Sequence, residues 1–584
     1  MLHFFQQAIP VDRRSGPAVA TPLQLTEAHE DDPILGVRLG HPLADRGFEC
    51  LMRAVLQAAL APENLDEWLD RLWQPPSPEE LARLLAPYRE TFRIDHPEFP
   101  AMQVRPSPGR LEETGGKESK RRGKAVLDEE DAEPDGAQPI SALLPDVPTG
   151  EAIRQDTDFF ARRGGVKAIG SGAMLPVLYG HMVLFPPGGG GYLSLPHGTD
   201  SLKYQIVGPT LWQTLWLNVL TRGAMGGASA VWPADPADPR VFPWRDPELP
   251  HLPLGRNEDG AAKPMERARL HPAHIPMPRR YLLSPPVQGR CDLTGIEGPI
   301  FTSYRRWPKG LQYNPRGWWF PSISEVRTVG KEPDGFSPAR AGGPLRLDDW
   351  LETAVLDEAD VARLQPGQRW RSIPPVLRQL RTVLETRSHE LTGLGGERQA
   401  GTAVSPDAAI RVRVYAQFLF GKAVGGMDQR ELPVWVLEGD SAGWMRGAVS
   451  SLVAAFGEMA GALRFSAQAA ARHGKREGPA AIADTLKDAL LARLDGAATA
   501  LPGRLATLAR EHGAGEPRQA AAAALRDDLL RRALTMALAL FDETFPVDGT
   551  GVTDKALLDG GRYTIPAERR RLVERLGQIR NRLN

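Results

Sequence analysis

The last part of the chain is written in the period of an amphipathic helix. From Ser441 onward, apolar residues recur every three or four positions in four long segments that short polar joins separate. Apolar stripes of this kind must be buried against one another. The sequence therefore predicts a C-terminal four-helix bundle over 431–584. The predicted core faces contain Leu452, Phe456, Met459 and Leu463; Ile482, Leu486 and Leu490; Leu525, Leu529, Met536 and Leu540; and Leu572, Leu576, Ile579 and Leu583.

Residues 1–430 follow a different pattern. A chain of 584 residues exceeds what one hydrophobic core usually holds, so at least two domains are expected. Asn64 can cap a helix that follows Pro62. Apolar periodicity predicts further helices at 42–60, 78–92, 210–220 and 374–387, and strands at 4–11, 281–283 and 410–420. We expect an α+β fold, with a large irregular mixed N-terminal domain followed by the bundle.

Composition limits the partners and the compartment. The 71 Lys and Arg residues nearly cancel the 72 Asp and Glu residues, so any binding of a polyanion must be local. The two cysteines, Cys50 and Cys291, are too few for a disulfide framework or a four-thiolate metal site. The sequence shows no signal-peptide core and no run of about twenty apolar residues. We expect a cytoplasmic protein with no membrane partner.

A charged insertion interrupts the N-terminal domain at 105–138. A basic group there, which includes Lys117, Lys120 and Arg122, is followed by an acidic group with almost no apolar residue. Such a segment cannot bury enough apolar surface to offset the entropy of ordering it. We predict a mobile insertion, most simply a solvated loop, although its basic group has the chemistry to contact a phosphate.

Aromatic and basic residues alternate over 301–320, and no acidic residue intervenes. The rings can stack on bases, while Arg305, Arg306 and Lys309 can donate to phosphate oxygens. The alternative is a Trp-rich hairpin that packs on a core, with its arginines stacked over rings. The residues alone leave both interpretations open. The rings belong to Phe301, Tyr304, Trp307, Tyr313, Trp318, Trp319 and Phe320.

Four successive glycines form a second candidate contact: Gly188, Gly189, Gly190 and Gly191. Because they lack Cβ atoms, their backbone amides can approach a phosphate or the floor of a groove. This is not a Walker A loop, since no Lys-Ser or Lys-Thr follows at the required spacing. The alternative is a flexible surface loop.

The last predicted helix is rich in arginine. Its cations offer either a solvated face or a basic seam against a phosphate chain, and the sequence leaves both possible. They are Arg569, Arg570, Arg571, Arg575, Arg580 and Arg582.

Catalytic motifs are weak in this sequence. The run from Gly439 to Gly443 matches the G-x-S-x-G of a nucleophile elbow, but no alternating strand and helix pattern surrounds Ser441. Asp440 or Ser441 as a helix N-cap is the simpler interpretation. His96-Pro97-Glu98 has no P-C-x-x-C partner, so a zinc deaminase is not indicated. We predict no enzyme and no catalytic residue, with a serine hydrolase that uses Ser441 as the distant alternative.

Several segments occur in an order typical of one protein family. They are Ile9-Pro10-Val11; YRETF at 88–92 followed by PAMQ at 100–103; ISALLPDVPTGE at 140–151; the glycine loop followed by TLWLNVL; MPRR at 277–280 followed by RCDLTG at 290–295; and GGERQA at 395–400. Along most of the chain, this order resembles the CasA family, the large subunits of the type I-E CRISPR surveillance complex Cascade.

The resemblance implies a DNA-recognising subunit. In that family, a glycine loop and a lysine finger recognise the protospacer-adjacent motif in double-stranded DNA from the minor-groove side, and a glutamine wedge helps to open the next base pairs. By resemblance, the four glycines form the loop and Lys309 the finger, with Arg305 and Arg306 as rivals. Gln399, beside Arg398, corresponds to the wedge. Pro148, Thr149 and Gly150 lie in the segment that carries the family's first nucleic-acid loop, where the RNA and the complex are contacted.

The same resemblance implies the partners. They are crRNA, target double-stranded DNA, the other Cascade subunits and the CRISPR helicase-nuclease that destroys the target. The alternative is a nucleic-acid-binding module of another DNA-processing assembly.

One feature of the family is missing from this sequence. Family members often hold structural zinc with two cysteine pairs, but here 168–172 contains no cysteine, and the second pair keeps only Cys291, with Thr294 in place of its partner. We therefore predict no zinc and no other cofactor.

Overall fold

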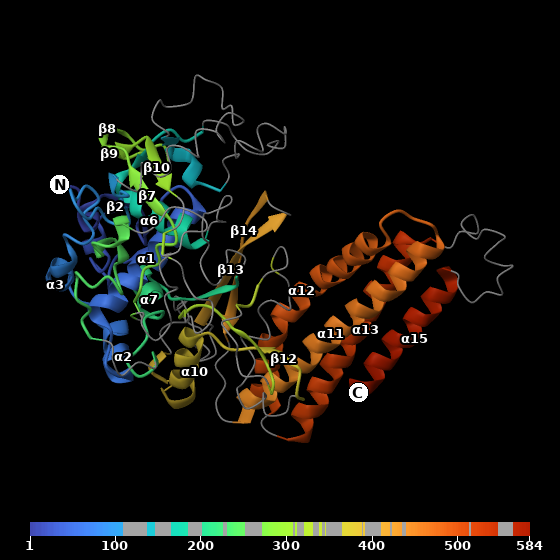
Figure 1. Cartoon of the computed structure of the whole chain (residues 1–584). Helices are drawn as coiled ribbons and strands as arrows, with labels where there is room; N and C mark the ends of the chain where they lie inside the picture. Colours follow the sequence, from blue (N-terminus) through green and yellow to red (C-terminus); the bar gives the residue numbers. More distant parts are fainter. Residues whose placement is uncertain are drawn as a thin grey trace. The chain divides into compact units, whose positions relative to one another are not determined.

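The structure is a computed structural model, and it divides into two compact units that are described separately below (Figure 1). The first unit takes in Met1–Pro344, Leu364–Val383 and Ile410–Glu431, and the second contains the C-terminal helices. The residues that the structure describes are 1–108, 137–145, 165–184, 201–225, 231–251, 271, 273–307, 310–311, 320–330, 338–340, 345, 365–387, 389–391, 410–420, 423–434, 440–512, 515–546 and 565–583.

Two helices in backbone contact form the centre of the first unit. They are α1 (Pro42–Leu60) and α6 (Ser171–Leu184), and every residue of α6 is buried. A Cβ atom placed on Gly47 would lie 2.0 Å from the carbonyl oxygen of Pro176, and one on Gly180 would lie 2.7 Å from that of Leu43. The two helices therefore approach one another more closely than helices with side chains at these positions can.

The other helices of this part of the chain are shorter. They are α2 (Leu65–Trp73), α3 (Pro78–Leu85), α7 (Leu211–Trp216) and α10 (Pro375–Arg387). The Asn64 side chain accepts from the Glu67 amide at 3.0 Å and so caps α2, as the sequence predicts. The indole N–H groups of Trp68 and Trp216 donate to the carbonyl oxygens of Val219 and Trp68, which satisfies both buried rings.

The described strands form small sheets. Every strand pair with a defined register among them is antiparallel. The sheet orders are β2-β1-β3, β4-β10-β7, β5-β9-β8, β14-β13-β6 and β11-β12. The strands are β1 (Ile9–Arg13), β2 (Gly16–Ala20), β3 (Ile34–Val37), β4 (Gln138–Pro139), β5 (Ile169–Gly170), β6 (Lys203–Val207), β7 (Arg280–Leu283), β8 (Val287–Arg290), β9 (Glu297–Phe301), β10 (Ser303–Trp307), β11 (Val326–Thr328), β12 (Arg369–Arg371), β13 (Ile410–Phe420) and β14 (Ala423–Val434).

The described C-terminal helices of the second unit form a four-helix bundle, drawn from orange to red in Figure 1, so the predicted α+β fold with a C-terminal bundle is confirmed. Its helices are α11 (Asp440–His473), α12 (Pro479–His512), α13 (Glu516–Thr544) and α15 (Ile565–Leu583). Most of the predicted core positions are buried, including Phe456, Met459 and Leu572 at 0% exposure. Within α11, Gly447–His473 is long and apolar enough to cross a membrane by composition alone, but its apolar face is this bundle core.

Most arginines of α15 pair within the bundle. Arg569 and Arg580 pair with Asp542 and Asp527 of α13, at 2.6 and 2.7 Å. Arg582 pairs with Glu458 of α11, Arg571 with Glu568, and Arg575 lies over the Phe465 ring. These partly exposed cations are therefore engaged in interhelical and local contacts, which favours the solvated face over a continuous seam for a phosphate chain.

Helix positions agree better with the sequence predictions than do short elements. The predictions of 42–60 and 410–420 are confirmed to the residue by α1 and β13. The strand predicted at 4–11 is wrong in its first half, because Phe4–Gln6 is a 3-10 turn. The helix predicted at 78–92 ends at Leu85, where Pro87 cannot supply a backbone donor. The mobile insertion predicted at 105–138 falls mostly outside the described residues.

The close contact at Gly47 predicts that any larger side chain at this position destabilises the protein. Gly47→Ala should lower the free energy of unfolding by about 1–3 kcal/mol, because the new methyl group meets the Pro176 carbonyl and forces α1 and α6 apart. Gly36→Ala is the matched control, since a Cβ atom there has no neighbour within 4 Å. Calorimetry of both variants checks the effect, and equal melting temperatures would contradict it.

Candidate nucleic-acid interface

Most predicted site residues lie outside the residues that the structure describes. They are Gly188, Gly189, Gly190 and Gly191; Lys309; Arg398 and Gln399; and Pro148, Thr149 and Gly150. Arg305 and Arg306 are described and lie on β10. The described residues that flank the glycine loop and Lys309 determine where these two segments begin and end.

Strand β10 places Arg305 and Arg306 on opposite faces of its sheet. It pairs with β7 in the register Tyr304↔Leu283, Arg305↔Leu282 and Arg306↔Tyr281. Since side chains alternate along a strand, Tyr304 and Arg306 share a face with Tyr281. The rings of Tyr281 and Tyr304 meet edge to face at 5.7 Å, and Tyr281 meets His181 of α6 in the same way at 5.6 Å. Arg306 therefore faces the end of α6.

The described rings of the aromatic stretch belong to the protein core. Phe301, Tyr304 and Phe320 are 2%, 1% and 7% exposed. The Tyr304 hydroxyl donates to the Gln138 side chain at 2.9 Å. For these three rings, stacking on bases is the wrong interpretation and the packed alternative is correct, because Phe301 of β9, Tyr304 of β10 and Phe320, which lies outside the strands, are all buried. Trp307 is half-buried, and Tyr313, Trp318 and Trp319 lie outside the described residues.

A basic cluster lies at the C-terminal end of α6. We call it the His181 cluster, and it consists of His181, Arg279, Tyr281 and Arg306. Arg279 is 1% exposed, and its Nη1 donates to the carbonyl oxygen of His181 at 2.8 Å. That carbonyl belongs to the last turn of α6, where helical carbonyls have no partner within the helix and carry partial negative charge. Arg279 therefore caps α6.

The surroundings of His181 keep its imidazole neutral. Burial lowers the pKa of His181 well below its ordinary value, and the nearby charges of Arg279 and Arg306 lower it further. The Nδ1 atom lies 2.9 Å from the carbonyl oxygen of Leu143 and donates to it when that nitrogen carries the proton. The positive charge at this end of α6 thus resides on the two guanidinium groups.

The chain that follows Lys309 is attached to the same place. The amide of Gly310 donates to the Pro278 carbonyl at 3.1 Å, and that of Leu311 donates to the Met277 carbonyl at 2.8 Å. A Cβ atom on Gly310 would lie 2.4 Å from the oxygen of Met277 and 2.5 Å from the nitrogen of Arg279. Glycine is therefore required for this close approach.

The chain that follows the glycine loop meets the end of the aromatic stretch. Strand β6 begins at Lys203, which forms a bridge with Ile323, and the Tyr204 amide donates to the Ser322 carbonyl at 2.8 Å. Every residue of β6 is buried. The chain thus leaves α6 near Arg279, whose neighbours also hold Gly310 and Leu311, and the strand after the glycine loop contacts the residues just after Phe320.

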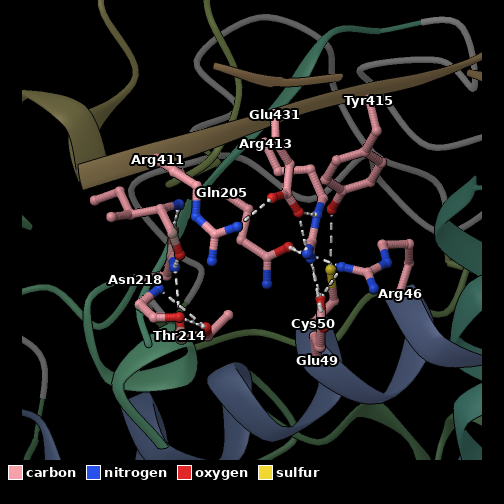
Figure 2. A network of polar contacts seen from close by, with 12 residues as sticks. Arg46, Glu49, Cys50, Gln205, Thr214, Asn218, Arg411, Arg413, Tyr415 and Glu431 are labelled. Atoms are coloured by element: carbon pink, nitrogen blue, oxygen red, sulfur yellow. Dashed lines mark hydrogen bonds and ion pairs between the residues drawn. The ribbon is translucent and has the colours of Figure 1, made fainter. Parts of the chain in front are cut away.

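A polar network, buried or nearly buried except at Glu431, fixes the strand that follows the predicted wedge (Figure 2). Arg413 of β13 donates to Glu49 of α1 at 3.1 Å, to Gln205 of β6 at 3.0 Å and to Glu431 of β14 at 2.6 Å. Burial raises the pKa of Glu49, and the Arg46 guanidinium opposes the rise. Since an unpaired buried charge is costly, this network ties β13 and β6 to the central helix.

The residues around Cys291 do not fit a structural zinc site. Its thiol is buried and accepts from the Thr294 amide at 3.4 Å, and a Cβ atom on Gly170 would lie 3.0 Å from the Cys291 Cβ. Asp292 Oδ2 accepts from the amides of Lys167 and Ala168 at 2.6 and 2.8 Å. Within the described part of the chain, no group of three or more His, Cys, Asp or Glu side chains is placed to hold a metal ion. A structural zinc site takes four such ligands.

Ser441 lies in the first turn of α11. The strand before α11, β14, belongs to a small sheet, whereas a nucleophile elbow stands at the end of a strand in a parallel sheet. The described strands provide antiparallel pairings instead, which favours the helix-start interpretation of Ser441.

An irregular α+β unit combined with a long four-helix bundle defines the class of fold. A family model described as CRISPR-associated protein Cse1 (CRISPR_cse1) matches residues 6–537. The chain therefore belongs to the Cse1 family, whose solved members include proteins also called CasA. The resemblance to CasA, the large-subunit family of type I-E Cascade, is confirmed.

Solved structures of the family share this fold over nearly the whole chain. CasA from Thermus thermophilus has 18% identity and a TM-score of 0.59, covering 98% of this chain and 99% of that chain. Thermobifida fusca Cse1 has the same identity and TM-score and covers 98% of both chains. A chain of a CRISPR RNA-guided surveillance complex has 15% identity and a TM-score of 0.56, covering 100% and 99%. No curated protein matches significantly.

The Cys291 geometry predicts stability that does not depend on metal. Asp292→Ala should lower the free energy of unfolding by about 1–2 kcal/mol, because two backbone amides lose their acceptor. Asp292→Asn keeps one acceptor oxygen and should lose less. A chelator should leave the melting temperature of the wild type unchanged, and a fall in its presence would contradict this account.

The His181 cluster predicts a dependence of stability on pH. The folded state binds the His181 proton only far below pH 6.5, whereas the unfolded chain binds it near 6.5, so the free energy of unfolding falls as pH drops below 6.5. One proton contributes at most about 1.4 kcal/mol per pH unit. His181→Asn keeps a donor for Leu143 and should flatten the dependence in urea unfolding at pH 7.5 and 5.5. The exposed His389, changed to Asn, serves as the control.

Proposed function

We propose that this protein is the large subunit of a type I-E Cascade complex and recognises the protospacer-adjacent motif in double-stranded DNA. In this proposal, Gly188 to Gly191 approach the minor groove, Lys309 is the basic finger, and Gln399 beside Arg398 forms the wedge that helps to open the duplex for pairing with crRNA. The protein acts in the cytoplasm, without catalysis of its own.

The paired ends of two distant segments carry this proposal. The segment with the four glycines follows α6, whose last turn contacts Arg279, and precedes β6, whose first residue Lys203 bridges to Ile323. Lys309 is followed by Gly310, which contacts the backbone beside Arg279, and the rest of that segment leads to Ile323. Two segments that start and end together are well arranged to meet one ligand. This supports a shared binding edge for the loop and the finger.

The chemistry of the segments suits the minor groove. That groove is narrow and displays a degenerate pattern of acceptors, so a backbone without side chains and one long cation can read it with tolerance. Arg306 belongs to the His181 cluster, which favours Lys309, or Arg305 on the opposite face, as the finger. The fixed ends supplied by buried α6 and β6 reduce the entropy lost on binding.

The remaining partners follow from the family and from one similar structure. The chain of a CRISPR RNA-guided surveillance complex shares this fold, which supports crRNA and the other Cascade subunits as partners. Pro148, Thr149 and Gly150 are the proposed contact to the RNA and the complex. Docking of the helicase-nuclease completes the proposal.

The finger is tested by Lys309→Ala in the assembled complex. We expect affinity for a motif-containing duplex to fall about tenfold, because one cation is lost from the groove, while loading of crRNA stays intact. The exposed Lys167, changed to Ala, is the control for a general charge effect. Unchanged motif-dependent binding in a gel-shift or interferometry assay would argue against the role of Lys309.

The glycine loop is tested by Gly189→Leu combined with Gly190→Leu. The added bulk should reduce binding of the motif-containing duplex by more than Lys309→Ala does, because it keeps the backbone out of the groove. A target whose strands are already separated bypasses motif recognition and should still bind. Equal loss for both DNAs would place the defect elsewhere.

A further inference from the structure

We propose that the first unit holds one small monovalent anion, of the size of chloride, between Arg53 of α1 and Gln417 of β13. The two side chains are 8% and 2% exposed. Among the described residues, the Arg53 Nη1 atom and both amide atoms of the Gln417 side chain have no hydrogen-bond partner. Buried polar groups are nearly always paired, so unpaired groups at neighbouring positions call for a ligand. The inference is independent of the proposed function, because the site lies inside the unit and involves no contact with DNA.

The contacts between β13 and α1 place these two side chains next to one another. On one face of β13, Arg413 donates to Glu49 of α1 at 3.1 Å. Two residues further along the same face, the Tyr415 hydroxyl lies 3.2 Å from the sulfur of Cys50 (Figure 2). The contacts therefore advance along strand and helix in the same direction. The two proposed ligands of the anion come next on these faces, one strand repeat and one helical turn further along.

Arg53 has no carboxylate partner in the described part of the chain. Arg46 and Arg413 both pair with Glu49. Glu431 pairs with Arg413 as well, so the carboxylates of this layer are already engaged. A guanidinium group stays protonated in proteins, and a buried charge without a counter-charge is costly. An anion bound beside Arg53 removes this cost.

The neighbouring side chains do not supply the missing negative charge. Burial raises the pKa of Cys50, Tyr179 and Tyr415, so all three stay neutral near pH 7. Arg53 lies close enough to Cys50 and Tyr179 to oppose this rise in pKa, which is not enough to ionise them. The Arg53 guanidinium carbon also lies 5.9 Å from the centre of the Phe320 ring, but a cation–π contact offsets much less than the desolvation of an ion.

A small monovalent anion suits this site better than water or an oxyanion does. A water molecule pairs with the Gln417 amide, but it carries no charge to offset the guanidinium group. Phosphate or sulfate carries more acceptor oxygens than the Arg53 Nη1 and Gln417 Nε2 groups can satisfy. A halide ion has a single charge and accepts from any direction, so one guanidinium and one amide group match it.

The test uses the isolated full chain without DNA. The variants are R53M and Q417M, which keep an unbranched side chain and remove its N–H donors. The control is R13M, because Arg13 is also nearly buried but has its own carboxylate, Glu27, at 2.5 Å. One readout is the melting temperature across a chloride series at constant ionic strength, with gluconate as the replacing anion. The other is the position of bromide, located by anomalous scattering in crystals that contain sodium bromide.

We expect the melting temperature of the wild type and of R13M to rise with chloride and then saturate, because an ion that binds only the folded state stabilises it. R53M should lose this dependence. It should also be no less stable than the wild type without chloride, since methionine removes an uncompensated buried charge. Q417M should need about tenfold more chloride to reach half of the rise. Bromide should appear between Arg53 and Gln417 in wild-type crystals.

Three outcomes would overturn the inference. The first is the same chloride dependence in R53M as in the wild type, which indicates a general salt effect. The second is a bromide peak in the crystal without a saturable effect of chloride in solution, which indicates an adventitious ion only. The third, decisive if R53M does not fold, is an unchanged chloride dependence in Q417M. Because no readout involves DNA, each of these failures leaves the proposed function as it stands.

Discussion

The contact between α1 and α6 sets the positions of most elements in the first unit. Glycines at 47 and 180 let the two backbones touch, and this allows α6 to be buried along its whole length. A wholly buried helix has few ways to shift, so its C-terminus is a fixed point. The segment with the four glycines leaves from that point, and the strand to which it returns is buried as well.

The buried or nearly buried side chains of Arg279 and Arg413 extend this rigidity toward the candidate interface. Arg279 caps α6 and, through its neighbours, holds the chain that follows Lys309. Arg413 ties β13 and β14 to Glu49 on α1 and so fixes the strand that follows the predicted wedge (Figure 2). Buried charges are expensive to leave unpaired, so each of these arginines holds its partners in one geometry. Three segments far apart in sequence thereby receive fixed ends.

The alternatives that the sequence left open were decided by pairing and burial. The rings of Phe301, Tyr304 and Phe320 looked equally suited to bases and to a core, and in the folded chain all three are buried. The arginines of α15 looked equally suited to phosphate and to solvent, and carboxylates on α11 and α13 engage three of them. The turn at Cys291 is stabilised by the Asp292 carboxylate and by the buried Cys291 thiol, both of which accept from backbone amides.

By itself, the sequence determined the bundle, helix α1, strand β13 and the family. The elements follow from the local periodicity of apolar residues, and the family follows from the order of motifs along the chain. It did not reveal α6, since a helix that is apolar on every side has no periodic face to detect and also contains Pro176. It also did not single out Arg279, although adjacent arginines before a buried strand are a signal, since arginine is seldom buried without partners. Only the tertiary structure could bring His181, Arg279 and Gly310 together, because their contacts join residues about 30 to 100 positions apart, and local patterns carry no record of such distances.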